Sequence, residues 1–497
     1  MSQPTLNACW IRRGAGLVGL GPAHRVSLDD LGQAETWWSE LLAGLDPAGR
    51  ELSWGVDRSE WERPTRPDGA AAGPERPRGA DQSERERPRG MGPVAFVSAP
   101  FDPDHSSARV ELVVPQTVVG RQGDCAWSVD WGRAWDLVVE AGRAGGGTTV
   151  GGTTKGGAGS GPPAGPGNRT KTGPDNNRTP AGPGDRTRTE PENRTKTGPG
   201  NRTTGDLEDG PAPGTAVDAA SGPGLVQFQG GALSPERWMD AVDQALATIR
   251  AGGLDKVVLA RDLLARAERP IDPGWLLRRL LERYRDTWVF AVDGLIGATP
   301  ELLVRRDHGL VTSRVLAGTI RRRGHGDAED LARALAGSSK DLAEHEYAVA
   351  SVARGLEPYC SAMNVPETPF VLRLPNVMHL ASDITGVSRT TASVLELARA
   401  IHPSAAVCGT PTDRARRTIR ELEGMDRGRY AGPVGWVGVG GDGDIGIALR
   451  CGQLAEDRLS LRLYAGCGIV ADSAAAAELS ETEAKLAVMR QALGPDA

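Results

Sequence analysis

The chain has 497 residues, 39% of them hydrophobic, and a formal net charge of −6 at pH 7, so it can bury a large core and nucleic acid is not an expected partner. Its six cysteines lie far apart without metal-ligand spacing, which argues against a zinc site or a disulfide framework. Because the sequence shows neither an export signal nor an apolar run of about 18 residues, we expect a cytoplasmic protein with no membrane partner.

The first part of the chain alternates apolar and turn-like segments. Residues 1–57 contain LVGLGPAHRVSL and then WWSELLAGL, which predicts a helix. Residues 58–92 are rich in Arg, Glu and Pro without a hydrophobic period, so we expect a disordered loop. Strands are predicted again in residues 93–143. The N-terminal part of the fold is therefore expected in two pieces.

A second stretch of low complexity follows. Residues 144–224 are rich in Gly, Pro, Thr and Asn and contain an imperfect NRTKTGPG repeat. They offer few apolar residues to offset the entropy of ordering, so we expect a long disordered insert. Without an export signal, a linker is a better interpretation than glycosylation. The NRT sequons concerned begin at Asn168, Asn177, Asn193 and Asn201.

Residues 225–497 form a dense segment of mixed strands and helices, which we call the C-terminal segment. Strands are predicted in LDKVVLARDL, WVFAVDGLIGAT, GLVTSRVLAG, YAGPVGWVGVG, GDIGIALRCGQL and RLSLRLYAGCGIV. Helices are predicted over about 327–359, in VLELARAIH and DRARRTIRELEG, and at the C-terminus from Ser473. Because the strands follow one another with few helices between them, the predicted fold class is α+β with largely antiparallel sheets.

Lysine is rare in this chain. Of 58 basic residues only six are lysines, and three of these lie in the second low-complexity stretch. Arginine stays protonated in proteins, whereas lysine can lose its proton in a suitable environment. Lys256, Lys340 and Lys485 therefore stand where arginine would not serve.

Two predicted helices each carry a pair of carboxylates three residues apart. The pairs are Asp341 with Glu344 and Glu478 with Glu481. Residues at this spacing lie on one helix face, and four carboxylates could hold Mg²⁺, which prefers oxygen ligands. The same spacing is also typical of a solvated helix face, and Glu481 with Lys485 makes an ordinary i,i+4 ion pair. Spacing alone leaves both interpretations open.

Several single residues fit a site for a small dianion. Lys256 begins the apolar run VVLA, where it is either a buried base or a strand-end lysine whose stem covers apolar surface. Glu301 is either a proton donor or a first-turn residue. His379 is typical of a hydrogen-bonded core histidine, and a buried Arg450 needs an anionic partner. The glycines of YAGCGIV either offer backbone N–H groups to an anion or only permit tight packing.

Ten segments resemble, in order, the motifs of the chorismate-utilising enzymes, most closely those of isochorismate synthases. They span about residues 225–493 and read DKVVLAR, GATPELLV, RVLAGTIRR, SSKDLAEHE, LPNVMHLASDITG, IHPSAAVCGTP, RGRYAGPVGW, IALRCG, YAGCGIV and ELSETEAK. Residues 1–57 and 93–143 resemble the family's weaker N-terminal part. The resemblance implies antiparallel sheets packed together with helices outside, and an isomerase that converts chorismate to isochorismate with Mg²⁺, by water attack on the ring and loss of the ring hydroxyl.

The resemblance also implies a role for each matching residue. Lys256 would be the general base and Glu301 the general acid. Glu344 and Glu481 would bind Mg²⁺, with Asp341 and Glu478 as supports. Tyr430 and Arg450 would bind the pyruvyl carboxylate, Gly466 and Gly468 would present backbone donors, Lys485 would neutralise substrate charge, and His379, Gly318 and Thr319 would line the ring.

Related activities differ at single positions. Ala317 stands where aminodeoxychorismate synthases resemble PIKGT, with a lysine nucleophile, and anthranilate synthases lack a lysine at the position of Lys256. No glutamine amidotransferase subunit is therefore expected. Salicylate synthase, which shares the lysine and LAGT, stays an alternative, as does a non-catalytic scaffold, against which the retained catalytic set argues. Cys467 departs from the family, which more often has Ala there. Menaquinone and siderophore pathways both use isochorismate, so the pathway stays open.

Overall fold

The structure is a computed structural model that describes residues 5–45, 55–57, 92–123, 125–130, 148–150, 222–321 and 328–494. The four sequons and nearly all of the two stretches predicted to be disordered, 58–92 and 144–224, lie outside these residues. Within the second stretch, Thr148–Val150 form a short strand, β7, that pairs with β2 (Ala15–Leu28).

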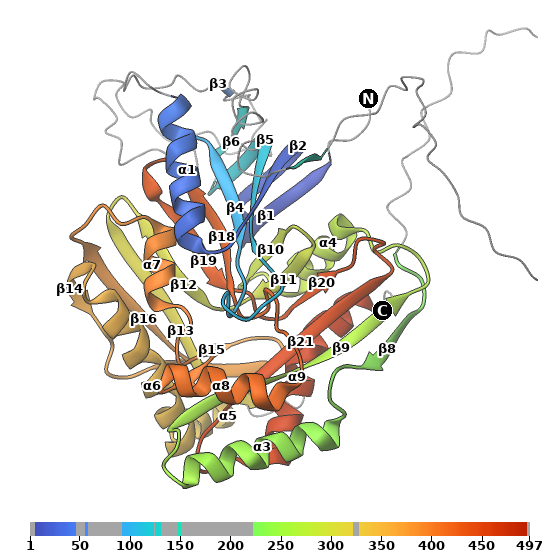
Figure 1. Ribbon diagram of the computed structural model, residues 1–497, viewed down its shortest axis with the longest axis vertical. Helices are drawn as coiled ribbons and strands as arrows, with labels where there is room; N and C mark the ends of the chain where they lie inside the picture. The colour runs from blue at the N-terminus through green and yellow to red at the C-terminus, as the bar shows by residue number, and fades with distance from the viewer. Residues whose placement is uncertain are drawn as a thin grey trace, which may run out of the picture. The chain divides into compact units, whose positions relative to one another are not determined.

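The described strands form one continuous antiparallel sheet (Figure 1). In its strand order, the strands from the N-terminal part lie in the middle. The middle strands are β1 (Leu6–Arg12), β2, β5 (Val110–Gln122) and β4 (Val94–Ser98), with β6 (Cys125–Asp130) beside β5 and β3 (Gly55–Asp57) beside β6. Beyond β1 the sheet continues into one arm through β10 (Trp288–Val292), and beyond β4 it continues into another through β18 (Pro433–Gly438). The N-terminal strands therefore join two arms built from the C-terminal segment.

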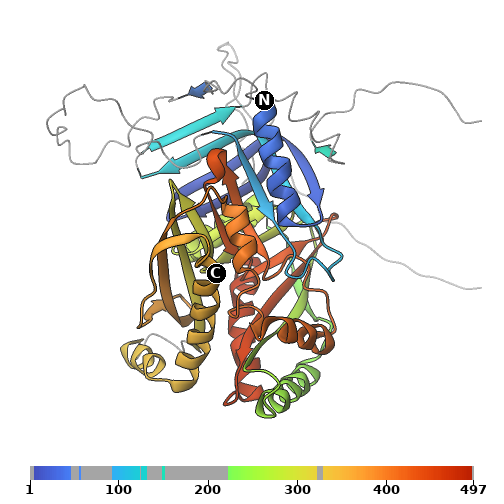
Figure 2. The same ribbon diagram turned by 60° about the vertical axis from the view of Figure 1, so that its left-hand side comes forward.

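We name these the β9 arm and the β13 arm after their long strands. In Figure 2 the β9 arm is the green and red region and the β13 arm is the yellow and orange-brown region, both below the blue strands. The β9 arm runs β10 (Trp288–Val292), β11 (Leu295–Thr299), β20 (Cys451–Leu454), β21 (Ser460–Ile469), β9 (Lys256–Ala267) and β8 (Val226–Gly230), with β17 (Gly409–Thr410) on the other edge of β9. The β13 arm runs β18 (Pro433–Gly438), β19 (Gly443–Ile447), β12 (Leu302–Asp307), β13 (Leu310–Arg321) and β16 (Val377–Ser388), and β16 also pairs with β14 (Cys360–Asn364) and β15 (Phe370–Arg373).

The helices cover the arms. Helices α3 (Pro235–Arg250), α4 (Pro273–Arg283), α8 (Thr412–Glu423) and α9 (Ala475–Leu493) pack on the β9 arm, and α5 (Ala328–Ala336), α6 (Ser339–Leu356) and α7 (Val394–Ile401) pack on the β13 arm. Helix α1 (Leu31–Leu45) lies beside α7 (Figure 1). None of the helices in the described part of the chain has the length and apolar character needed to cross a lipid bilayer.

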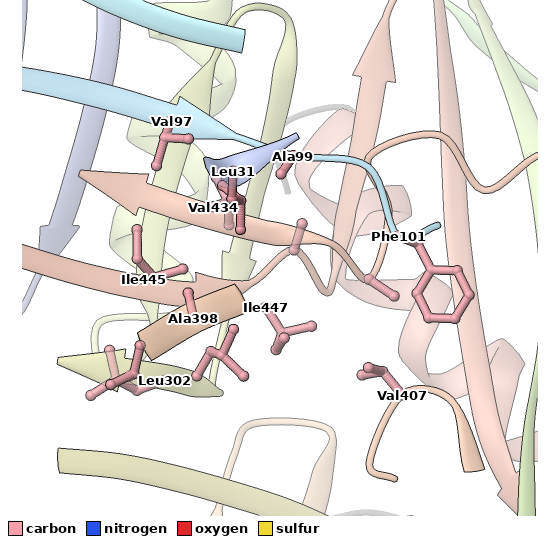
Figure 3. Packing of buried hydrophobic residues seen from close by; sticks show 14 of the residues in the cluster. Leu31, Val97, Ala99, Phe101, Leu302, Ala398, Val407, Val434, Ile445 and Ile447 are labelled. Atoms are coloured by element: carbon pink, nitrogen blue, oxygen red, sulfur yellow. The ribbon is translucent and has the colours of Figure 1, made fainter. Parts of the chain in front are cut away.

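The largest core cluster includes the contact between the N-terminal strands and the β13 arm and also reaches α3 and β9. Figure 3 shows part of it, with Val97 and Ala99 from the N-terminal part close to Val434 and Ile445 from β18 and β19. These side chains are at most 2% exposed. Burial of apolar surface contributes roughly 25 cal/mol per Å², so this cluster holds the two parts of the fold together.

Several predicted elements are confirmed and others need correction. The helix predicted over 327–359 is two helices, because Gly337 follows the end of α5 and the Ser338 side chain caps α6 by accepting a hydrogen bond from Asp341 N. The C-terminal helix begins at Ala475 rather than at Ser473, whose hydroxyl accepts a hydrogen bond from Val470 N. Residues 443–454 form two strands, not one, and α3 and α4 were not predicted.

Candidate active site

A cavity lies among β9, β13, β16, β21, α6 and α9. Its wall combines apolar residues, such as Val258, Leu316 and Val407, with many of the predicted site residues. A cavity with few, converging polar groups is typical of a small-molecule site. The predicted residues in the wall are Glu301, Thr319, Glu344, His379, Tyr430, Arg450, Gly466, Gly468 and Lys485.

Five predicted residues, by contrast, are not part of the cavity wall: Lys256, Gly318, Asp341, Glu478 and Glu481. All of them nevertheless touch or neighbour residues in the wall. Lys256 is fully buried, with Nζ 3.3 Å from both Glu344 Oε1 and the Glu344 carbonyl oxygen. The amine therefore lies directly behind the cavity wall and not in bulk solvent.

The bulge in β13 holds the carboxylates of α6. The register of β13 against β16 shifts between Ala317 and Thr319, and Gly318 has φ +76°. Gly318 N donates to Glu344 Oε2 at 3.2 Å, and Thr319 N donates to Asp341 Oδ1 at 3.2 Å. A Cβ on Gly318 would lie 2.9 Å from the Asp341 Cβ, so glycine is required both for φ and for the close approach of α6.

The glycines of β21 face the cavity with their backbone. Gly466 and Gly468 pair with Ala260 and Val258 of β9. Ala260 N and Val258 N donate to groups on the opposite edge of β9, namely Glu423 Oε1 and Cys408 O. Since N–H groups alternate in direction along an antiparallel pair, Gly466 and Gly468 turn their N–H groups away from β9. A Cβ on Gly468 would lie 2.0 Å from Glu344 Oε1, so a side chain here would displace that carboxylate.

Three lysine–glutamate pairs form what we call the helix side of the site. Besides Lys256 with Glu344, Lys485 Nζ lies 2.6 Å from Glu481 Oε1 and donates to Gly466 O at 2.8 Å. Lys340 Nζ lies 2.5 Å from Glu478 Oε1. Burial, together with the neighbouring Glu481 carboxylate, raises the pKa of Glu478. Lys340 had no predicted role, although its rarity singled it out.

Glu301, His379 and Arg450 form another part of the wall, which we call the strand side. Glu301 lies between β11 and β12 and is 4% exposed. Burial raises the pKa of Glu301 to about 8, against the opposing fields of Lys256 and Arg450. The carboxyl group therefore holds its proton at neutral pH. Of the placements considered for Glu301, on a helix or in a loop, the structure shows the loop, between two strands.

Arg450 lies in the break between β19 and β20 with φ +50°, and its side chain reaches His379. An Arg450 Nη2 donates to His379 Nε2 at 2.9 Å, and His379 Nδ1 lies 3.1 Å from Thr319 Oγ1. Since a guanidinium only donates, Nε2 accepts and Nδ1 carries the hydrogen. Burial and Arg450 hold the pKa of His379 well below its usual value, so the ring is neutral.

Arg450 is buried, and none of the residues that the structure describes pairs with it through a carboxylate. Within the same residues, its Nε has no hydrogen-bond partner. Burial lowers the pKa of the guanidinium. Tyr430 stacks on Tyr464 at 5.0 Å between ring centroids and lines the same wall. A buried, unpaired guanidinium in a cavity favours an anionic ligand.

The four carboxylates predicted to hold Mg²⁺ come from α6 and α9, as expected. Within the described residues, no three of their oxygen atoms lie within 4.8 Å of one another, and three of the four side chains are paired with lysines instead. Their chemistry fits a hard cation, because all offer carboxylate oxygens. A cation would also relieve the repulsion between the carboxylates of Glu478 and Glu481.

Residues 220–494 match the family model described as chorismate binding enzyme. The chain belongs to the chorismate-binding enzyme family. Over 276 residues it is 44% identical to the isochorismate synthase DhbC of Bacillus subtilis, an alignment that covers 53% of this chain and 69% of that protein. Over 274 residues it is 40% identical to a salicylate biosynthesis isochorismate synthase of Pseudomonas aeruginosa, which covers 53% of this chain and 56% of that protein.

The fold is shared with solved structures of the family. The menaquinone-specific isochorismate synthase MenF of Escherichia coli superposes with a TM-score of 0.64 and 20% identity, over 99% of this chain and 90% of that one. The predicted family and the predicted α+β fold are therefore confirmed, and the family is one of enzymes. The likeness includes chains from more than one pathway, so the pathway stays open.

Some residues that line the cavity had no predicted role. Arg427 lines the cavity and forms a buried ion pair with Glu423. The signal was present in EGMDRG, where a Glu and an Arg stand four residues apart next to an apolar segment. The apolar wall residues, such as Ala406 and Leu449, carry no local signal and are found only from the fold.

Proposed function

We propose that this chain is an isochorismate synthase, which isomerises chorismate to isochorismate with the help of Mg²⁺. The observation that carries the proposal is the presence of both a buried amine and a neutral carboxyl group at one cavity. The amine lies directly behind the wall on the helix side, and the carboxyl group, which is protonated at neutral pH, lines the strand side. A base and an acid at one site support water addition at one ring carbon and hydroxyl loss at another.

The reaction proceeds as one exchange of oxygen atoms. Lys256 takes a proton from the attacking water while the water oxygen bonds to the ring. Both ring double bonds shift, the C–O bond of the departing hydroxyl breaks, and Glu301 gives its proton to that hydroxyl, which leaves as water. Glu344, 3.3 Å from Lys256 Nζ, stabilises the ammonium ion that forms. No water is consumed overall.

The strand side binds the side-chain carboxylate of the substrate. Arg450 has a free Nε and Tyr430 stands beside it, so both are available to the pyruvyl carboxylate. The neutral His379 holds Arg450 in place by accepting its hydrogen bond at Nε2. On the other side of the ring, Nδ1 of His379 contacts the Thr319 hydroxyl. Lys485 and the N–H groups of Gly466 and Gly468 face the remaining negative charge.

Glu344 and Glu481 would bind the Mg²⁺ ion, with Asp341 and Glu478 as supports. The metal would supply a fixed positive charge for the ring carboxylate. The Glu481 side chain would exchange its present partner, Lys485, for the ion. Isothermal titration of the protein with Mg²⁺ tests this assignment. Glu481→Gln should weaken Mg²⁺ binding about tenfold or more, whereas Glu483→Gln, two residues away on the same helix, should leave it unchanged.

Product analysis separates the candidate functions. Purified protein is incubated with chorismate and Mg²⁺, and the products are resolved by chromatography. Isochorismate alone supports the proposal. Salicylate with pyruvate supports the salicylate synthase alternative, which shares Lys256 and the LAGT segment around Ala317. Unchanged chorismate supports a binding scaffold and contradicts both enzymatic readings.

A further inference from the structure

A buried ion pair with no part in the proposed chemistry lies beside β9. Glu423 ends α8, and Arg427 follows after Gly424, which has φ +63°. Arg427 contacts the carboxylate twice, from Nη2 at 2.5 Å and from Nε at 2.9 Å, and the side chains are 3% and 1% exposed. Removing two charges from water is costly unless further hydrogen bonds satisfy them. Those further bonds show what the pair does.

The pair completes the edge of β9 at the point where β17 stops. β17 pairs only with Lys256 and Val257. Beyond it, Val258 O accepts from Arg427 Nη2 at 2.8 Å, and Ala260 N donates to Glu423 Oε1 at 2.7 Å. Buried backbone groups need partners, and here two side chains take the place of a missing strand.

The same guanidinium also holds other parts of the cavity wall. Arg427 Nη1 donates to Val407 O at 2.9 Å, and the group lies 4.2 Å above the ring of Phe101. Val258, Val407 and Arg427 itself line the cavity, and Figure 3 shows Val407 and Phe101 among the buried residues of the core. One ion pair therefore joins β9, the loop before β17, and the N-terminal part of the fold.

We propose that Glu423 and Arg427 are positioning residues that fix β9, and with it Lys256, at the wall of the cavity. Lys256 precedes Val258 by two residues on the same strand, so a shift of the Val258–Ala260 edge moves the amine relative to the cavity. Four of the five N–H groups of Arg427 donate to protein acceptors, and Glu423 also accepts from Ala260 N, so the protein itself holds the pair in place. This inference rests on the proposed function for its catalytic readout only.

Glu423→Gln tests the proposal, because it keeps the length of the side chain and removes its charge. We expect kcat to fall about ten- to a hundredfold, since small misplacements of a catalytic group have effects of this size, with KM for chorismate changed less than about threefold. Amide hydrogen exchange at Ala260 should speed up at least about tenfold. The matched control is Asp444→Asn, which breaks the bidentate pair with Arg305 outside the cavity wall.

A second variant guards against loss of folding. The double variant Glu423→Gln/Arg427→Gln leaves no unpaired buried charge, so it should fold. The amide hydrogen of Ala260 should still exchange faster in it than in wild type. Thermal melting shows which variants are folded at the assay temperature. The proposal is overturned if folded variants keep the wild-type kcat, or lose it only as much as Asp444→Asn does. A wild type that forms no isochorismate would instead contradict the proposed function, and amide exchange across residues 256–260 would still decide the positioning role.

Discussion

The two walls of the cavity differ in how their charges are satisfied. On the helix side, Glu344 and Glu481 each have a lysine within 3.3 Å. On the strand side, Glu301 is held neutral by burial, and Arg450 has no carboxylate partner among the residues that the structure describes. The helix side therefore has a carboxylate, Glu481, whose present partner can be exchanged for a cation, and the strand side has a cation without an anion from the described residues. A substrate with two carboxylates and a metal ion would complete both.

The largest expected effect separates the two possible roles of Lys256 on the helix side, base or counterion. Lys256→Arg keeps the positive charge beside Glu344 but cannot lose a proton. We expect kcat to fall by about a thousandfold or more, within the range of lost acid–base catalysis. Steady-state kinetics with chorismate provide the measurement. Lys256→Met, which removes the charge as well, is the matched variant. If Lys256→Arg kept substantial turnover, the residue would be a counterion and not the base.

The next largest expected effect concerns Glu301, the carboxyl group on the strand side that burial keeps protonated. Because burial raises the pKa of Glu301 to about 8, kcat should fall as pH rises through about 8. Glu301→Gln should lower kcat about a hundredfold or more and remove this alkaline limb. A folded-state pKa above the unfolded one stabilises the fold at low pH, and this contribution is lost as pH rises toward 8. A flat pH profile between 6 and 9 in wild type would argue against Glu301 as the acid.

Arg450 tests the unpaired cation. Arg450→Met removes the charge while filling much of the space, and we expect KM for chorismate to rise about ten- to a hundredfold, since a charge-assisted hydrogen bond contributes about 1.5–3 kcal/mol. The control is Arg462→Met, because Arg462 pairs with Asp262 on β9 and does not line the cavity. An increase in KM for both variants alike would point to a general loss of positive charge and not to an anion contact.

The sequence predicted the strand side less well than the helix side, for physical reasons. Because residues three positions apart lie on one face of a helix, Glu478 and Glu481 share a face of α9 wherever that helix packs. Local periodicity is therefore enough to predict this pair. The environment of Arg450 depends on a break between two strands that were predicted as one, and its contact with His379 joins residues 71 positions apart. Likewise, the fold class follows from local strand patterns, whereas the insertion of β1, β2, β5 and β4 between the two arms depends on pairings distant in sequence.

The smallest expected effect concerns the third pair of the helix side. Lys340 is the most exposed of the three lysines, at 28%, and its ammonium lies 2.5 Å from Glu478 Oε1. If a cation competes with the lysines for these carboxylates, Lys340→Met should tighten Mg²⁺ binding about two- to fivefold, the size expected of a partly exposed ion pair. Calorimetry with Mg²⁺ measures this, and Lys340→Arg, which keeps the charge, should leave the affinity unchanged. Weaker Mg²⁺ binding in Lys340→Met would instead mean that Lys340 holds Glu478 ready for the metal, so that the pair is a support of the site and not a competitor for it.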